Sequence, residues 1–160
     1  MKPGASSSSL IVEEIAGSDD WKQAQCVLLF HPLKSEPDLR PLLEATGRQI
    51  ILPRVIGDTL ELRRYAGDDC LRRAGYGMLE PDPESCELVA PKEIDLAIVP
   101  GVAFDPLTKL RLGRGGGFYD RLLADPEFSA TTIGAGFALQ LYRNLPAETH
   151  DQALDELVTA

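Results

Sequence analysis

The sequence has 160 residues, of which 25 are acidic and 16 are basic, so its formal net charge at pH 7 is −9. This charge argues against nucleic acid or an anionic membrane surface as the main ligand, because both bind best to a basic face. No apolar run approaches the roughly 20 residues of a membrane-spanning helix, and the start lacks the apolar stretch of a secretory signal, so we expect a soluble cytoplasmic protein.

The chain begins with a low-complexity serine run, behind which Leu10, Ile11 and Ile15 have the spacing of one helix face. Short apolar segments follow, each rich in Val, Ile and Leu and each bounded by turn formers. We expect each to be a strand, because such segments are typical of strands buried on both faces of a mostly parallel sheet. These segments are Cys26–Phe30, Gln49–Pro53, Leu60–Tyr65, Ile94–Val99 and Thr132–Ala135.

Two helices are expected between these strands. In Pro37–Thr46 the leucines recur at helical spacing, and Gly47 is placed to end the helix. The succession of strand, helix and strand predicts a βαβ unit. A second short helix, Gly117–Ala124, opens directly after a glycine run. The pattern predicts an α/β fold with an open, mainly parallel sheet flanked by helices, and with ligands at the carboxyl ends of its strands.

The length allows one sizeable core and is short for two ordinary domains, so we expect a single domain over residues 1–160. The three cysteines, Cys26, Cys70 and Cys86, are odd in number and widely spaced, which fits neither a disulfide framework nor a zinc site. We expect buried or idle free thiols.

The segment Arg111–Asp120 (RLGRGGGFYD) carries the pattern most closely tied to chemistry. Consecutive glycines let backbone N–H groups converge on an anion, and a helix that begins at Phe118 adds free N–H groups. Arg111 and Arg114 can donate charge-assisted hydrogen bonds to phosphate oxygens, and Asp120 can hold the Mg²⁺ that accompanies a nucleotide. The local positive cluster in this acidic chain comprises Lys109, Arg111, Arg114 and Arg121.

This pattern favours phosphate recognition, although it is neither a P-loop nor the dinucleotide-binding fingerprint. The structural alternative is a flexible glycine loop with solvated arginines and an aspartate that caps a helix. Phe118 and Tyr119 favour a binding site, because aromatic side chains beside a phosphate site can pack on a ring system.

Two neighbouring segments together resemble a known family. Val99–Asp105 (VPGVAFD) followed by Arg111–Asp120 closely resembles the signature of the 5-formyltetrahydrofolate cyclo-ligases, also called methenyltetrahydrofolate synthetases. The resemblance extends over nearly everything from Trp21 to the end. Its other marks, in the family's order, are Ser35–Asp38, Tyr76–Pro81, Gly136 and Phe137 with Gln140, and Leu145 and Pro146 before His150 and Asp151.

The resemblance implies a ligase of one-carbon metabolism that binds ATP and Mg²⁺. Its small-molecule substrate would be 5-formyltetrahydrofolate, with or without a polyglutamate tail, and its products 5,10-methenyltetrahydrofolate, ADP and phosphate. No nucleophilic side chain or general base is required, because phosphorylation converts the formyl oxygen into a leaving group and the protein positions reactants and stabilises charge. We expect a monomer.

The family's functional residues can be carried over position by position. The implied ATP-binding residues are Arg111, Leu112, Gly113, Arg114, Gly115, Gly116, Gly117, Phe118 and Tyr119, with Arg114 as the catalytic cation. The implied folate-binding residues are His31, Glu36, Tyr76, Arg114 and Phe118, and the implied magnesium ligands are Asp120 and Asp151. On the residues alone, Glu36 could instead face solvent, His31 could be a turn residue, and Tyr76 could belong to the core.

The first 20 residues depart from the family's pattern, which begins with a basic helix that reaches over the ATP phosphates. From Met1 to Trp21 the only basic residue is Lys2, so we treat residues 1–20 as an atypical, shortened N-terminus. Two alternatives therefore stay open. One is a non-catalytic binder of folate or nucleotide that lost turnover with the basic arm, and the other is an unrelated sugar-phosphate or CoA-handling enzyme on a similar scaffold.

Overall fold

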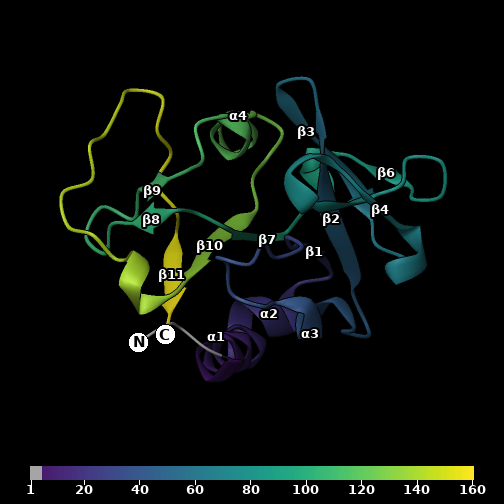
Figure 1. The fold of residues 1–160 in the computed structure, drawn as a ribbon, viewed down its shortest axis with the longest axis horizontal. Coiled ribbons are helices and arrows are strands. Elements are labelled where there is room, and N and C mark those ends of the chain that lie inside the picture. The colour runs from purple at the N-terminus through teal and green to yellow at the C-terminus, as the bar shows by residue number, and fades with distance from the viewer. Residues whose placement is uncertain (1–4) are drawn as a thin grey trace.

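A seven-stranded sheet forms the centre of the protein (Figure 1), in a computed structural model that describes residues 5–160 except for the side chains of Ala5 and Tyr76. The strand order is β11-β10-β7-β1-β2-β3-β6, and all neighbours from β11 to β2 run parallel. The strands are β1 (Cys26–Leu28), β2 (Gln49–Ile56), β3 (Thr59–Arg64), β6 (Leu88–Val89), β7 (Leu96–Val99), β10 (Thr131–Gly136) and β11 (Glu156–Thr159). The predicted α/β fold with a mainly parallel sheet is confirmed.

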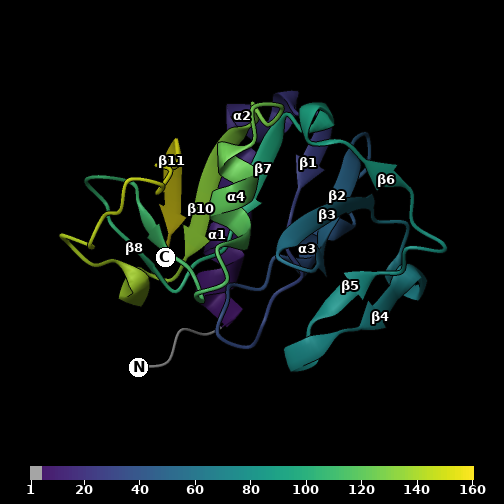
Figure 2. The same cartoon turned by 90° about the horizontal axis from the view of Figure 1, so that it is seen from above.

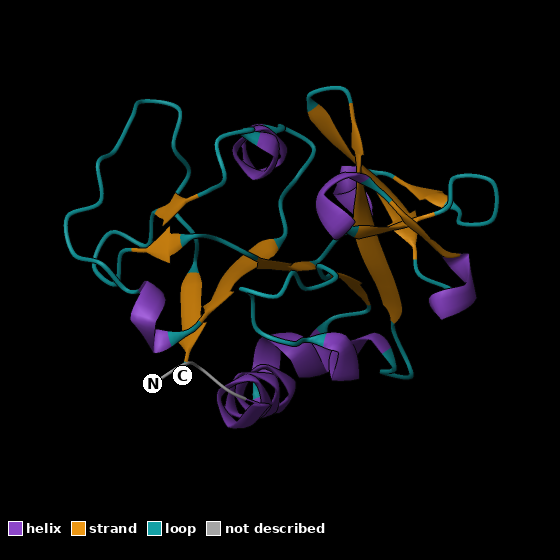
Figure 3. Cartoon of the chain, viewed as in Figure 1, coloured by secondary structure: helices purple, strands orange, loops and turns teal. Residues whose placement is uncertain are grey.

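Helices cover both faces of this sheet (Figure 3). Helices α1 (Ala5–Gly17), α2 (Asp19–Gln23) and α3 (Arg40–Leu43) lie on one face, and α4 (Phe118–Ala124) lies on the other. Two small antiparallel sheets flank the centre, one formed by β4 (Leu71–Arg73) and β5 (Leu79–Pro81), the other by β8 (Ala103–Phe104) and β9 (Arg111–Leu112). Short 3₁₀ helices are η1 (Asp68–Cys70), η2 (Gly75–Gly77), η3 (Pro91–Glu93) and η4 (Ala138–Gln140).

The core consists of two apolar layers that share the sheet. Val27 and Leu29 belong to the layer under α1–α3, whereas Leu28 between them belongs to the layer under α4. Successive residues of a strand point to opposite faces, so a strand buried on both sides needs a continuous apolar run. The three free cysteines lie buried, as predicted. Among residues 5–160, no helix is both long and apolar enough to cross a membrane.

The helix expected near the start of the chain is present as α1, but its buried face does not include all three predicted residues. Ile11 and Ile15 are fully buried, whereas the side chain of Leu10 is 55% exposed. Consecutive helical residues are about 100° apart around the axis, so Leu10 cannot share the narrow stripe that Ile11 and Ile15 form one turn apart.

The predicted βαβ unit is confirmed, because β1 and β2 are parallel neighbours, but its helix is shorter than Pro37–Thr46. Helix α3 has only four residues and carries Pro41 in its first turn. The segment before it is held outside the helix, since the Asp38 N–H donates to the Ser8 hydroxyl of α1 at 3.0 Å. That contact joins segments 30 residues apart in the chain, so local spacing could not indicate it.

Strand β3 was expected to be a buried strand of the parallel part of the sheet, but it is antiparallel. It pairs antiparallel with β2 through a tight turn at Gly57 and Asp58, where Gly57 has a φ of 59°. The adjacent β6 is also antiparallel, so this side of the sheet ends in a hairpin rather than in parallel strands.

Candidate functional site

The glycine loop, residues 113–117, connects β9 to α4 on the edge where the parallel strands end (Figure 2). Two hydrogen bonds fix this place. Nε of Arg111 donates to the carbonyl of Pro100, just after β7, at 2.8 Å, and Nη2 of Arg114 donates to the Ser35 hydroxyl, in the segment after β1, at 2.8 Å. The loop therefore lies where the fold class predicts a ligand.

The backbone of the loop follows a path that requires glycine. Gly117 has a φ of 69°, in the left-handed region that side chains disfavour. At Gly116 a Cβ atom would overlap the ring of Phe118, which covers this part of the loop. The loop thus has a defined backbone conformation and packs against an aromatic ring, which differs from the flexible glycine loop of the structural alternative.

Besides Arg111, two more of the four basic side chains near the loop donate to backbone carbonyls. Nζ of Lys109 donates to the carbonyl of Asp155 at 2.7 Å. Arg121 donates to the carbonyls of Asp58 and Gly116, at 2.6 Å and 2.5 Å.

Arg111 is a buried part of the scaffold. Its side chain is only 6% exposed, and its Nη1 lies 3.6 Å from Oδ1 of Asp120. The guanidinium carbon lies 5.2 Å from the ring centroid of Tyr119. Burial lowers the pKa of Arg111, and the charges of Asp120, Tyr119 and Glu36 act in the opposite direction. Arg111 is therefore not a solvated arginine, in contrast to the structural alternative above.

Arg114 has a different environment. It is exposed, and the hydrogen bond to the neutral hydroxyl of Ser35 is the contact that holds it. Within residues 5–160, it alone of the four cations has no carboxylate or carbonyl partner. Its guanidinium is consequently the one most available to an anionic ligand.

Glu36 follows Ser35 and lies in the same segment. Its Oε1 accepts from the Leu33 N–H at 2.8 Å, and its side chain is half-buried. Burial raises the pKa of Glu36, and the Leu33 N–H and the charges of Arg114 and Arg111 partly oppose that shift. A half-buried carboxylate beside two arginines can pair with N–H donors of a ligand.

The other predicted folate-binding residues have fewer recognisable contacts than Glu36 and Arg114. His31 is half-buried in the segment after β1, and burial, followed by the charge of Arg40, lowers its pKa. Tyr76 falls in η2, and its side chain lies outside the described residues. Phe118 is half-buried at the start of α4, while burial raises the pKa of Tyr119 behind it. Leu112 is half exposed on β9.

The two predicted magnesium ligands have separate partners. Asp120 is paired with Arg111, whereas Oδ2 of Asp151 accepts from the Glu148 N–H at 2.7 Å and its Oδ1 lies 3.7 Å from Nε2 of His150. In the described part of the chain, no group of three or more His, Cys, Asp or Glu side chains could hold a metal. Magnesium that arrives with a nucleotide needs only one or two carboxylates, so the assignment of Asp120 and Asp151 stays a prediction.

Gln140 links two strand ends and was not among the predicted site residues. Its Nε2 donates to the carbonyls of Gly101 and Val102, at 2.7 Å and 3.1 Å, and its Oε1 accepts from the Phe137 N–H at 2.7 Å. Ser35 was also not predicted as a partner of Arg114. Their only sequence signal is their place within the segments that resemble the family.

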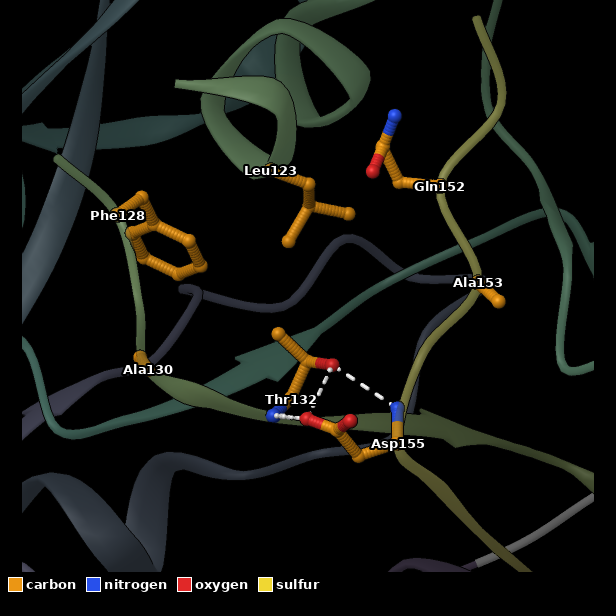
Figure 4. Close-up of a pocket in the computed structure, with 7 residues that line it drawn as sticks. All are labelled: Leu123, Phe128, Ala130, Thr132, Gln152, Ala153 and Asp155. Atoms are coloured by element: carbon orange, nitrogen blue, oxygen red, sulfur yellow. Dashed lines mark hydrogen bonds between the residues drawn. The ribbon is translucent and has the colours of Figure 1, made fainter. Parts of the chain in front are cut away.

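A small cavity of about 170 Å³ lies between the end of α4 and β10 (Figure 4). Two of its polar side chains are paired with each other, since Oδ2 of Asp155 accepts from the Thr132 N–H at 2.8 Å and from the Thr132 hydroxyl at 3.2 Å. The cavity lies at the start of β10 rather than at its carboxyl end, and no residue of the glycine loop lines the cavity. This cavity is therefore separate from the candidate site.

Comparisons with known proteins identify the family of the chain. The model of the 5-formyltetrahydrofolate cyclo-ligase family matches residues 2–160. A probable 5-formyltetrahydrofolate cyclo-ligase of Schizosaccharomyces pombe is 30% identical over 96% of this chain and 84% of its own length. The 5-formyltetrahydrofolate cyclo-ligase of Mycolicibacterium smegmatis is 32% identical over 83% of this chain and 72% of its own.

Solved structures extend the comparison. The 5,10-methenyltetrahydrofolate synthetase of Aquifex aeolicus superimposes with a TM-score of 0.80 and 35% identity, covering 95% of this chain and 77% of its own. The synthetase of Mycoplasma pneumoniae, at 21% identity and a TM-score of 0.75, covers 96% of this chain and 85% of its own and supports the fold alone. The chain therefore belongs to the 5-formyltetrahydrofolate cyclo-ligase family of enzymes.

Proposed function

We propose that this protein uses ATP and Mg²⁺ to convert 5-formyltetrahydrofolate to 5,10-methenyltetrahydrofolate. The observation that carries the proposal is the position of Arg114, an exposed cation at the glycine loop that donates to the segment containing Glu36. A candidate phosphate site and a half-buried carboxylate are thereby adjacent, which supports a reaction between a nucleotide and a pterin. The names of the relatives support the same reaction.

The chemistry needs an activated oxygen, because a formamide oxygen is a poor leaving group. The formyl oxygen forms a bond to the γ-phosphorus of ATP, and the bond from that phosphorus to ADP breaks. The second folate nitrogen then bonds to the formyl carbon and loses its proton, and phosphate leaves with the former formyl oxygen. Such a sequence depends mainly on positioning and on stabilisation of charge.

Each role follows from the environment of the side chain. Arg114 meets the charge that grows on the transferred phosphoryl group, and amides of the glycine loop bind the phosphate chain. Glu36 accepts hydrogen bonds from N–H groups of the pterin. Asp120 would hold Mg²⁺ together with phosphate oxygens, and the ion would neutralise negative charge on those oxygens.

The test is an assay of the purified chain with 5-formyltetrahydrofolate, ATP and Mg²⁺, in which the absorbance of the methenyl product and the release of ADP are followed together. We expect product and ADP in equal amounts, and no product without ATP or after chelation of the metal. Binding of both ligands without product would instead identify a non-catalytic binder. Binding of neither would contradict the proposal altogether.

A further inference from the structure

The side chain of Arg121 turns back from α4 toward the glycine loop. Its Nη2 donates to the carbonyl of Gly116 at 2.5 Å, and its guanidinium carbon lies 5.5 Å from the ring centroid of Phe118. The Nε of the same group donates to the carbonyl of Asp58 at 2.6 Å. A single guanidinium thus contacts the loop, the helix and a segment 63 residues away.

The distant segment is the turn between β2 and β3, and α4 packs against β3. The hairpin belongs to the central sheet, so the carbonyl of Asp58 connects Arg121 to the main body of the fold. Because Asp58 contributes only its backbone carbonyl, this support does not depend on the identity of that side chain.

The contact determines how the loop presents its amides. In a trans peptide the C=O and the following N–H point in opposite directions. Arg121 fixes the direction of the Gly116 carbonyl, so the N–H of Gly117 must point to the other side of the loop. A Cβ atom at Gly117 would lie 2.9 Å from Nη1 of Arg121, which shows how closely the backbone passes the guanidinium.

We propose that Arg121 is a positioning residue that holds the glycine loop in the shape that receives the nucleotide. This inference rests on the proposed function. Three consecutive glycines lose more backbone entropy on ordering than other residues, and a loop that is ordered in advance loses less when the ligand binds. Arg121 donates to two backbone carbonyls and so orders the loop, whereas Arg114 contacts the ligand.

The first test needs no ligand. Hydrogen exchange of the free protein is compared between the wild type and Arg121→Ala, as protection factors. The amide of residue 121 reports on the loop, because it donates to the carbonyl of Gly117 at 3.0 Å. We expect that amide to exchange faster in the variant, with unchanged exchange for β7. The matched control is Arg143→Ala, which removes the same charge from an exposed side chain with no hydrogen bond or ion pair recorded within residues 5–160. Unchanged exchange at the loop in Arg121→Ala would overturn the proposal.

The second test is nucleotide affinity. Loss of a charge-assisted hydrogen bond predicts that Arg121→Ala weakens MgATP about tenfold and leaves the Kd for 5-formyltetrahydrofolate unchanged. Arg121→Lys should fall between, because an ammonium keeps the charge but lacks the fork that reaches two carbonyls. Faster exchange with unchanged nucleotide affinity would reduce Arg121 to a structural residue. If the wild type itself fails to bind nucleotide, the proposed function falls, and the exchange measurement still decides whether Arg121 orders the loop.

Discussion

At the residue scale, Arg111 and Arg114 come from one short motif but have opposite environments. Arg111 is buried against Tyr119 and paired with Asp120, whereas Arg114 is exposed and, among the described residues, hydrogen-bonds to Ser35 alone. We expect Arg114→Ala to lower kcat by about a hundredfold or more, the usual cost of removing a group that stabilises transition-state charge. Its melting temperature should stay close to that of the wild type.

Arg111→Ala provides the contrast to that variant. It leaves a buried carbonyl and a carboxylate without their partner, so we expect the free energy of unfolding to fall by about 1–3 kcal/mol. Urea unfolding and steady-state kinetics on both variants separate the two roles. A stable Arg111→Ala with lost activity, or an unstable Arg114→Ala, would reverse the assignment.

Asp120 is expected to set the dependence on magnesium. Asp120→Asn should raise the Mg²⁺ concentration needed for half-maximal activity and lower kcat by about a hundredfold, because the amide lacks the negative charge of the ligand. Asp58→Asn is the control, since its exposed side chain forms no hydrogen bond or ion pair with residues 5–160, while its carbonyl remains. An unchanged magnesium titration in Asp120→Asn would remove Asp120 from the metal site.

Glu36 should make folate affinity and stability depend on pH in opposite ways. Burial raises its pKa above the ordinary 4.5, so the folded state binds the proton more tightly than the unfolded chain. The stabilisation from this protonation is present below 4.5 and is lost as the pH rises through the pKa of the folded protein. Folate binding needs the carboxylate, so it should strengthen over that same rise.

The variant Glu36→Gln removes both effects. We expect it to be more stable than the wild type at about pH 7, to lose that advantage at about pH 4, and to bind folate weakly with little dependence on pH. Isothermal titration and urea unfolding at the two pH values measure this. Weakened ATP binding in place of folate binding would place Glu36 in the other half of the site.

The motif itself could be predicted from the sequence, but the difference between its two arginines could not. Burial of Arg111 depends on the carbonyl of Pro100 and the ring of Tyr119, which the fold brings to it. The contact of Arg114 with Ser35 spans 79 residues. Local composition indicates which residue types are present, whereas their exposure follows from tertiary packing.

At the element scale, Phe104 holds β7, β8 and β10 together. Its ring is fully buried, and Cβ atoms at Gly101, Gly134 and Gly136 would each lie within 2.8 Å of it. We expect Gly136→Ala to lower the free energy of unfolding by about 1–3 kcal/mol through overpacking. Adding Phe104→Leu should relieve part of that cost, and a double-mutant cycle in urea measures the coupling. Additive effects would show that the ring does not restrict this position.

The elements that could be predicted were those with a strong local pattern. Continuous apolar runs indicated β1, β2, β7 and β10, because strands buried on both faces need them. The edge strand β11 was missed, since only its two middle residues, Leu157 and Val158, are apolar. The length of α3 was overestimated because a contact from α1 holds the preceding segment in another conformation.

At the scale of the whole molecule, both core layers depend on one sheet. β1 contributes Val27 to one layer and Leu28 to the other, and the glycine loop and the segment of Glu36 both lie at the edge where the parallel strands end. Neither layer can therefore lose its structure while the other keeps its support. This supports the proposal, made from the length of the chain, that it forms a single domain.

A single domain predicts one cooperative unfolding transition that both ligands shift. At about a hundredfold excess over its Kd, a ligand that binds only the folded state adds about 2.7 kcal/mol. For a domain of this size that corresponds to a rise in melting temperature of about 5–10 °C. We expect 5-formyltetrahydrofolate and MgADP each to produce such a rise in one calorimetric peak, and Arg114→Ala to reduce the rise with MgADP. Two separate peaks, or a ligand that shifts only part of the transition, would show that the two layers unfold independently and that the site does not join them.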